Sequence, residues 1–235
     1  MDIKFSGIGG AFDVDWGNSS AVVEMKGKNY LIDCGNTVFP RLVRTSWASK
    51  IDAVLITHFH DDHVGSLSTF LAYYNKILGL GKLTVYLPNE SFRKGLLDLL
   101  SYSLGNPQKH ANFELLPEGL GIYALDTTGL HIKSMSSFAY CFSDEKSSIA
   151  YSGDLGDADV LFDFLLKQKL PQVKVFHEVS FFKMYAHAYY KDLEKHLAQW
   201  EIYGYHNNPL KKPEDCKIPL VYDYAQFHIQ PFYPE

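Results

Sequence analysis

The stretch Thr57-His58-Phe59-His60-Asp61-Asp62-His63-Val64-Gly65 places three imidazoles and two carboxylates within six consecutive positions. It directly follows residues 52–56, a continuous apolar run typical of a strand buried on both faces. Neutral imidazole and carboxylate are ligands of Zn²⁺, Mn²⁺ and Fe. A loop that leaves a buried strand can turn such side chains to one side, whereas a continuous helix or strand cannot. The stretch therefore predicts a metal site at the end of a strand.

The composition is that of a soluble globular protein. A length of 235 residues suffices for one large domain with a buried core, and we find no internal repeat or linker, so residues 1–235 are predicted to form one domain. A net charge of −5 argues against a protein that grips a long nucleic acid by its phosphates. The three cysteines form no C-x-x-C pair, which favours reduced thiols and a cytoplasmic location. The sequence shows neither a signal peptide nor an apolar run long enough to span a membrane.

Hydrophobic periodicity predicts strands first and then strands alternating with helices. This order is typical of stacked sheets flanked by helices, an α/β architecture. The predicted strands are residues 3–5, 21–25, 29–33, 52–56, 83–87, 122–125, 130–134, 139–142, 148–152 and 173–176. The predicted helices are residues 66–78, 92–104, 160–169 and 190–200.

The metal-ligand stretch resembles a known family signature. Residues 58–63 match the H-x-H-x-D-H signature of the metallo-β-lactamase superfamily, and nearly the whole chain resembles its ribonuclease Z-like branch. The resemblance implies an αββα sandwich, with the site at the edges of the sheets. The other matching segments are residues 7–10, 18–20, 31–35, 151–154 (Y-S-G-D) and 176–181 (F-H-E-V-S-F).

This resemblance implies a site for two divalent metal ions, with Zn²⁺ expected first and Mn²⁺ as the alternative. His58 and His60 would hold the first ion, and Asp62 and His63 the second. Asp154, in the Y-S-G-D segment, would bridge the two.

Two further ligands have to be chosen from the remaining histidines. For the first ion only His110 and His131 lie between Gly65 and Asp154. Residues 131–137 look like the family's H-x-x-x-M-x-S arrangement, so we choose His131 and expect His110, in a polar loop, to be exposed. For the second ion we choose His206, which follows the strand-like residues 203–205, with His228 as the alternative.

The resemblance also implies catalytic roles. Two such ions lower the pKa of a bound water, and Asp62 would orient or deprotonate this nucleophile. His187 matches the place where ribonuclease Z-like enzymes keep a proton-donating histidine; the alternative is a surface histidine that precedes a helix. His177 and Glu178 follow a buried strand and are expected to orient the ligands. His196, within a charged helix, is expected to be solvated.

The spacing between two predicted ligands bears on the substrate. The ribonuclease Z likeness implies phosphodiester cleavage, but the tRNA-binding arm of that family lies between the third histidine ligand and the bridging aspartate. Here residues 132–153 leave room for two strands and a turn only. The chain resembles compact cyclic nucleotide phosphodiesterases of the phage anti-Pycsar type, which implies a small cyclic nucleotide as substrate, a homodimer, and the host cytoplasm as location for a phage-encoded protein.

Three other functions remain open on sequence alone. One is a ribonuclease Z-like tRNA 3′-processing endonuclease, and salt-dependent binding of tRNA would support it. Another is a lactone or thioester hydrolase, because the same pair of ions can attack a carbonyl carbon. The third is a metal-binding or scaffolding protein without catalysis.

Overall fold

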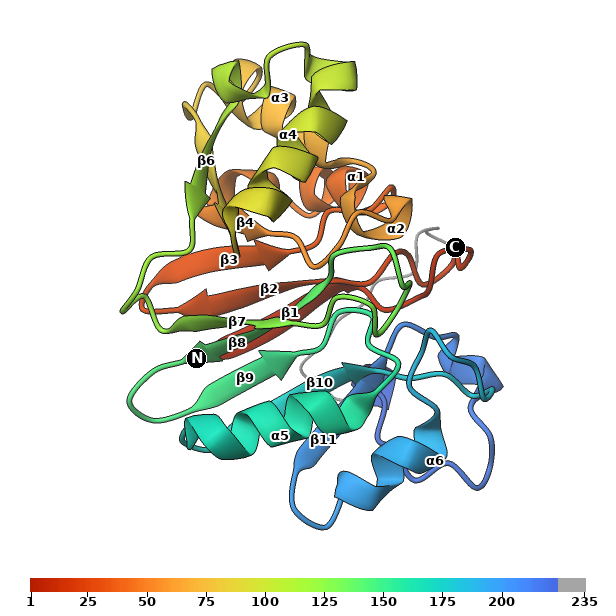
Figure 1. Ribbon diagram of the computed structural model, residues 1–235. Coiled ribbons are helices and arrows are strands. Elements are labelled where there is room, and N and C mark those ends of the chain that lie inside the picture. Colours follow the sequence, from red (N-terminus) through yellow and green to blue (C-terminus); the bar gives the residue numbers. More distant parts are fainter. Residues whose placement is uncertain (224–235) are drawn as a thin grey trace.

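Two β-sheets packed face to face form the centre of the computed structural model, which describes residues 1–223 (Figure 1). Within these residues the first sheet has six strands in the order β1-β2-β3-β4-β5-β6, and the second has five in the order β11-β10-β9-β8-β7. The strands of the first sheet are β1 Asp2–Gly7, β2 Ser20–Met25, β3 Lys28–Ile32, β4 Ala53–Leu55, β5 Leu83–Leu87 and β6 Ala111–Leu115. Those of the second are β7 Ile122–Asp126, β8 Phe138–Ser143, β9 Ser148–Tyr151, β10 Val173–Glu178 and β11 Glu201–Tyr205.

Large buried aromatic side chains fill the space between the sheets. Phe5 of β1 lies 5.5 Å from Phe176 and 5.7 Å from Tyr205 of the opposite sheet, measured between ring centroids. Tyr30 and Phe142 make a similar contact at 5.7 Å. Burying each such ring stabilises the fold by about 1.5–3 kcal/mol, so this layer holds the two halves of the sandwich together.

Helices cover the outer face of each sheet (Figure 1). Buried Leu67, Phe70 and Leu71 of α3 point toward the first sheet, because apolar residues three and four apart share one helix face. The layers are therefore helix, sheet, sheet, helix, which confirms the predicted αββα sandwich. The first sheet is covered by α1 Val38–Arg44, α3 Leu67–Lys76 and α4 Glu90–Leu104, and the second by α5 Ala158–Gln168 and α6 Tyr190–Leu193. The short α2 Asp61–Val64 and the 3₁₀ turns Ala48–Lys50, Pro107–Lys109, Glu194–His196, Pro209–Lys211 and Val221–Asp223 complete the elements.

Two predicted elements are wrong. Residues 130–134 form turns instead of a strand, because local bonds such as Leu130 N to Thr127 O curl the chain back on itself. The helix predicted over residues 190–200 is α6 followed by a 3₁₀ turn, and the side chains of that turn are bound by other segments. Glu194 accepts a hydrogen bond from the backbone N–H of Lys217, at 2.7 Å.

Among residues 1–223, none of the helices has the length and hydropathy that a membrane span requires. That residues 1–235 form one domain stays a prediction, because residues 224–235 lie outside the described part of the chain.

Candidate metal centre

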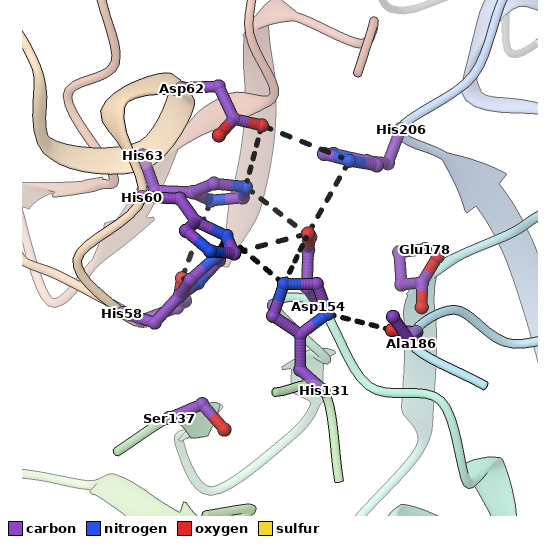
Figure 2. A network of polar contacts seen from close by, with 12 residues as sticks. His58, His60, Asp62, His63, His131, Ser137, Asp154, Glu178, Ala186 and His206 are labelled. Atoms are coloured by element: carbon purple, nitrogen blue, oxygen red, sulfur yellow. Dashed lines mark hydrogen bonds and ion pairs between the residues drawn. The ribbon is translucent and has the colours of Figure 1, made fainter. Parts of the chain in front are cut away.

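Parallel strand pairing brings distant segments to one edge of the sandwich. β3 and β4 run parallel in the first sheet, and β9, β10 and β11 run parallel in the second, so in each sheet these carboxyl ends share an edge. His58 follows β4, Asp154 follows β9 and His206 follows β11, while His131 lies between β7 and β8. Figure 2 shows that these side chains converge on Asp154.

All seven predicted ligand side chains lie in this cluster, as two sets of potential metal ligands. Within each set the ligand atoms lie within 4.8 Å of one another, and Asp154 belongs to both. Nε2 of His63 lies 3.2 Å from Asp62 Oδ2 and 3.3 Å from Asp154 Oδ1. Nε2 of His206 lies 3.5 Å from Asp154 Oδ2. One set is His58, His60, His131 and Asp154, and the other is Asp62, His63, Asp154 and His206.

The segment after β3 holds the ligand stretch in place. The carboxylate of Asp33 accepts a hydrogen bond from the backbone N–H of Thr57, at 2.7 Å. The N–H of Cys34 donates to the carbonyl of His63 at 2.7 Å, and the N–H of Ser66 donates to the carbonyl of Cys34 at 3.0 Å. Because β3 and β4 are neighbours, these bonds lock the loop that follows β4 onto the end of β3.

Hydrogen bonds at Nδ1 fix the ring orientation of four of the histidines. The Thr57 hydroxyl donates to Asp33 and the Ser19 hydroxyl donates to Gly9 O, so each can accept a proton from a histidine. With Nδ1–H facing outward, Nε2 is left as the lone-pair atom that faces the cluster. The pairs are His58 with Thr57 Oγ1 at 3.0 Å, His63 with Asp33 Oδ2 at 2.7 Å, His131 with Ala186 O at 2.7 Å, and His206 with Ser19 Oγ at 3.2 Å.

His60 faces the cluster with the other ring nitrogen. Its Nδ1 lies 3.0 Å from Nε2 of His58 and 3.1 Å from Nε2 of His131. Three imidazole nitrogens thus meet at one point, where a proton on Nδ1 of His60 could serve only one of the two Nε2 acceptors. Such an arrangement is unfavourable unless a cation binds there.

Two buried atoms of the cluster support the same interpretation. Nε2 of His63 and Oδ1 of Asp154 are buried and form no hydrogen bond of normal geometry in the described structure, although they lie 3.3 Å apart. Buried polar atoms are nearly always satisfied, and a divalent cation would satisfy both. The residues present therefore fit the two-ion site that the sequence predicts.

Electrostatics prepares the ligands for a cation. Burial lowers the pKa of His58 well below its usual value and that of His206 to about 4, so both are neutral at pH 7. For His63 burial also lowers the pKa, but Asp154 and Asp33 outweigh it and raise the pKa well above the usual value. A raised pKa means that His63 carries a proton on both ring nitrogens in the absence of a metal. Since metal ligation needs a neutral imidazole, a cation at Nε2 would displace the proton on that atom.

Asp33 contacts two residues of the ligand loop, a role that was not predicted from the sequence. It is fully buried and accepts hydrogen bonds from Thr57 and His63. A carboxylate behind a ligating histidine orients the ring and makes it a stronger base. The available signal was an acid at the end of the apolar residues 30–32, directly before a Cys-Gly turn.

The predicted proton donor, His187, lies beside the cluster. Its Nδ1 is 3.8 Å from Asp154 Oδ2 and 3.3 Å from Glu178 Oε2. Burial raises the pKa of Glu178 to about 7. Burial lowers the pKa of His187, but Glu178 outweighs it and raises that pKa to about 9. His187 is therefore protonated at neutral pH and only partly exposed.

The side chains of His177 and Glu178 point to opposite faces of the sheet, because successive side chains of a strand alternate between its faces. Oε1 of Glu178 accepts hydrogen bonds from the N–H groups of Leu155, at 3.2 Å, and Ala188, at 2.8 Å, next to Asp154 and His187. His177 instead stacks on Phe162 of α5 at 6.3 Å. That His177 helps to orient the ligands stays a prediction, since its Nδ1 donates to the carbonyl of Glu178 at 2.7 Å.

Two further histidines, His110 and His196, differ from expectation. His110, expected to be exposed, is buried beside β6 and belongs to neither ligand set. His196, expected to be solvated, stacks on Phe162 at 3.8 Å and bonds Asp159 at 2.8 Å. His110 directly precedes β6, and His196 ends a 3₁₀ turn that packs on α5. His228 lies outside the described residues.

Comparison with solved structures defines the class of fold. The metallo-β-lactamase fold protein YhfI from Bacillus subtilis matches 87% of this chain and 85% of its own, with a TM-score of 0.70 and 18% identity. The short form of human tRNase Z matches 94% of this chain and 96% of its own, with a TM-score of 0.67 and 18% identity. The chain therefore has the metallo-β-lactamase fold.

The sequence also matches a specific family within this fold. The model for the anti-Pycsar protein Apyc1 matches residues 1–218. The anti-Pycsar protein Apyc1 of Bacillus phage BSP38 is 31% identical over 221 residues, which is 84% of each chain. That of Bacillus phage 010DV004 is 28% identical over 224 residues, covering 85% of this chain and 84% of its own. The chain belongs to the Apyc1 family of anti-Pycsar proteins.

Proposed function

We propose that the chain is a dinuclear metal-dependent phosphodiesterase that hydrolyses a cyclic mononucleotide and so removes an immune signal. The observation that carries this proposal is the pair of ligand sets that share Asp154, with the imidazole of His187 3.8 Å from that carboxylate. The name of the matching family supports a role against Pycsar immunity.

The two ligand sets indicate which residues would hold each ion. His58, His60 and His131 would hold one ion, Asp62, His63 and His206 would hold the other, and Asp154 would serve both. When bound, Zn²⁺ or Mn²⁺ ions supply an activated water and neutralise the charge that develops on the phosphoryl oxygens. Asp62, whose Oδ2 lies 3.2 Å from Nε2 of His63 and 3.9 Å from Nε2 of His206, would help to hold one ion and orient the nucleophile.

His187 and Glu178 would supply the proton for the departing oxygen. A leaving alkoxide needs a proton, and a positioned acid typically contributes 10²–10⁴-fold in rate. The Glu178 carboxylate keeps His187 protonated, and the bond from the N–H of Ala188 to Glu178 holds the loop that carries it. The opened nucleotide would then leave with the proton from His187 on its 3′ or 5′ oxygen.

The short connection between His131 and Asp154 favours a small substrate. This connection contains only the end of the His131 turn, β8, β9 and the tight turn that joins them. With a net charge of −5 there is also little to hold a long polyanion. A cyclic mononucleotide presents one phosphodiester and fits a site of this kind.

A panel of substrates tests the proposal. Purified protein loaded with Zn²⁺ or Mn²⁺ would be given 3′,5′-cyclic mononucleotides, 2′,3′-cyclic nucleotides, precursor tRNA and an acyl lactone, each with and without chelator. We expect hydrolysis of 3′,5′-cyclic mononucleotides that chelator abolishes. His60→Ala and Asp154→Ala should remove turnover while the fold is largely kept, whereas His196→Ala, which changes a histidine outside both ligand sets, should keep turnover.

A ribonuclease Z-like activity on tRNA is the second candidate. It is favoured by the ribonuclease Z of Exiguobacterium, which is 32% identical over 117 residues, 49% of this chain and 37% of that one. In the same panel, cleavage of precursor tRNA without cleavage of cyclic mononucleotides would replace our proposal by this one. Turnover of the lactone alone would reassign the site to carbonyl chemistry.

A further inference from the structure

Two loops meet beside Asp154. We call residues 181–188 the donor loop, because they carry His187, and residues 127–137 the His131 loop. The donor loop is closed at its base by a hydrogen bond from Ser180 N to Ala188 O, at 2.7 Å. The His131 loop is closed by a bond from Thr127 N to Ser137 O, at 2.9 Å. Both loops are therefore compact, and their mutual contacts decide how they sit.

Two hydrogen bonds join the two loops directly, and Gly156 packs against both of them. The carbonyl of Ala186 accepts the Nδ1 proton of His131, at 2.7 Å, as Figure 2 shows. The Tyr185 hydroxyl donates to Gly129 O, at 2.8 Å. Gly156, which follows the Asp154 turn, donates its N–H to Leu130 O, at 2.9 Å, and a side chain there would lie 2.2 Å from Tyr185 O.

We propose that Tyr185 and Gly156 are positioning residues that hold the donor loop against the His131 loop, so that one unit orients both His131 and His187. The part that concerns His187 rests on the proposed function. Neither residue belongs to the ligand sets, and the Tyr185 side chain is 63% exposed.

The hydrogen bond to Ala186 shows why the two orientations are linked. His131 presents Nε2 to the cluster only while its Nδ1 proton has an acceptor, and that acceptor is the residue directly before His187. If the donor loop shifts, His131 loses its preference for this tautomer and His187 moves from its place 3.3 Å from Glu178. One loop movement would therefore weaken metal binding and proton donation together.

Two variants test the proposal, each with a control. Tyr185→Phe removes only the hydroxyl, and Tyr102→Phe, at a side chain 92% exposed on α4, is its control. Gly156→Ala places a methyl group against Tyr185 O. Its control is Gly27→Ala, which strains a φ of +73° but meets nothing within 4 Å. Gly27→Ala thus accounts for a general loss of stability.

Three measurements separate positioning from general damage. NMR of ¹⁵N-labelled histidine in the metal-free protein gives the tautomer of His131, and amide hydrogen exchange gives the opening of residues 186–188. Competition with a chelator gives the Zn²⁺ affinity. The ratio of turnover on alkyl and aryl phosphodiesters reports proton donation. For Tyr185→Phe we expect mixed tautomers, two- to about tenfold faster exchange, a similar loss of Zn²⁺ affinity and a lower alkyl-to-aryl ratio. Gly156→Ala should change each quantity further.

The outcomes distinguish this inference from the proposed function. Wild-type tautomer, exchange and Zn²⁺ affinity in Tyr185→Phe would overturn the inference, even if Gly156→Ala failed to fold. If the wild-type protein hydrolyses no phosphodiester, the proposed function fails, but the tautomer and Zn²⁺ measurements still decide whether the loops position His131.

Discussion

Four of the five histidines in the two ligand sets donate their Nδ1 protons to oxygens from other parts of the chain. Ser19 directly precedes β2 and Asp33 directly follows β3, while Thr57 belongs to the ligand loop and Ala186 to the donor loop. The sequence predicted the ligands, because they follow a known spacing. It did not predict these acceptors, because a backbone carbonyl or a serine hydroxyl leaves no distinctive signal in one sequence.

Asp33→Asn tests the one carboxylate among these acceptors. Asparagine tolerates the left-handed φ of 63° at this position and can still accept the Nδ1 proton of His63, but it carries no charge. We expect Zn²⁺ affinity at one of the two sites to fall by about 10–100-fold, measured by chelator competition. The control is Asp61→Asn, an exposed acid from the same stretch that belongs to neither set. An equal loss in both variants would mean that general charge, and not the contact with His63, matters.

The ion pair between His187 and Glu178 predicts a pH profile. The pKa of His187 is raised to about 9, so its donor form is present at neutral pH and is lost as the pH rises through about 9. Turnover of an alkyl phosphodiester should fall above that pH, and Glu178→Gln should move the fall to lower pH. Exposed Glu118→Gln is the control.

The comparison substrate for this profile is an activated aryl phosphodiester. Its leaving group needs no proton, so its turnover should not show the fall near pH 9. His187→Ala should slow the alkyl substrate by about 10²–10⁴-fold and the aryl substrate far less. Equal slowing of both substrates would remove His187 from the role of proton donor.

At the scale of elements, regular periodicity was predictable and local turn bonding was not. The buried strand over residues 52–56 and the helix near residues 92–104 correspond to β4 and α4. The missed β6 has polar and acidic residues at positions that face solvent, which hides it within a polar sequence. In the sequence, residues 130–134 alternate apolar and polar side chains as a strand does. In the structure they form turns around His131 and do not join a sheet.

Gly95 shows how a helix can affect the ligand loop. Glycine in a helix interior costs about 1 kcal/mol relative to alanine, yet α4 carries one where a Cβ would lie 2.9 Å from the ring of Phe59. Phe59 stands between His58 and His60 and packs on Phe92 at 4.3 Å. Gly95→Ala should therefore raise helix propensity but push Phe59 and weaken metal binding by several-fold, measured by chelator competition.

The matched control for Gly95→Ala is Tyr102→Ala, which also raises helix propensity but changes an exposed side chain of the same helix. Tyr102→Ala should leave metal affinity unchanged. If Gly95→Ala binds metal as tightly as the wild type, Phe59 adjusts without moving the ligands, and the prediction is wrong.

At the scale of the whole molecule, burial makes the cysteines unreactive. Burial raises the pKa of both the Cys34 and the Cys141 thiols to about 12, so about one in ten thousand is a thiolate at pH 8. Cys216 is also buried and its pKa is raised by burial. We expect all three thiols to react with a disulfide reagent only after denaturation. Rapid titration of one thiol in the native protein would contradict this.

The resemblance to the compact phosphodiesterases leads us to propose a homodimer. Light scattering after size-exclusion chromatography should give twice the chain mass of 26.7 kDa. A mass equal to one chain across micromolar concentrations would exclude a stable dimer.

The seam between the two sheets runs through the ligand cluster. His58, His60, Asp62 and His63 come from the first sheet, whereas His131, Asp154 and His206 come from the second. Bound cations would cross-link the two halves, so the melting temperature should climb with the logarithm of free Zn²⁺ once the sites begin to fill. Without bound cations the two sheets would lack this cross-link, so the metal-free protein should unfold at a lower temperature.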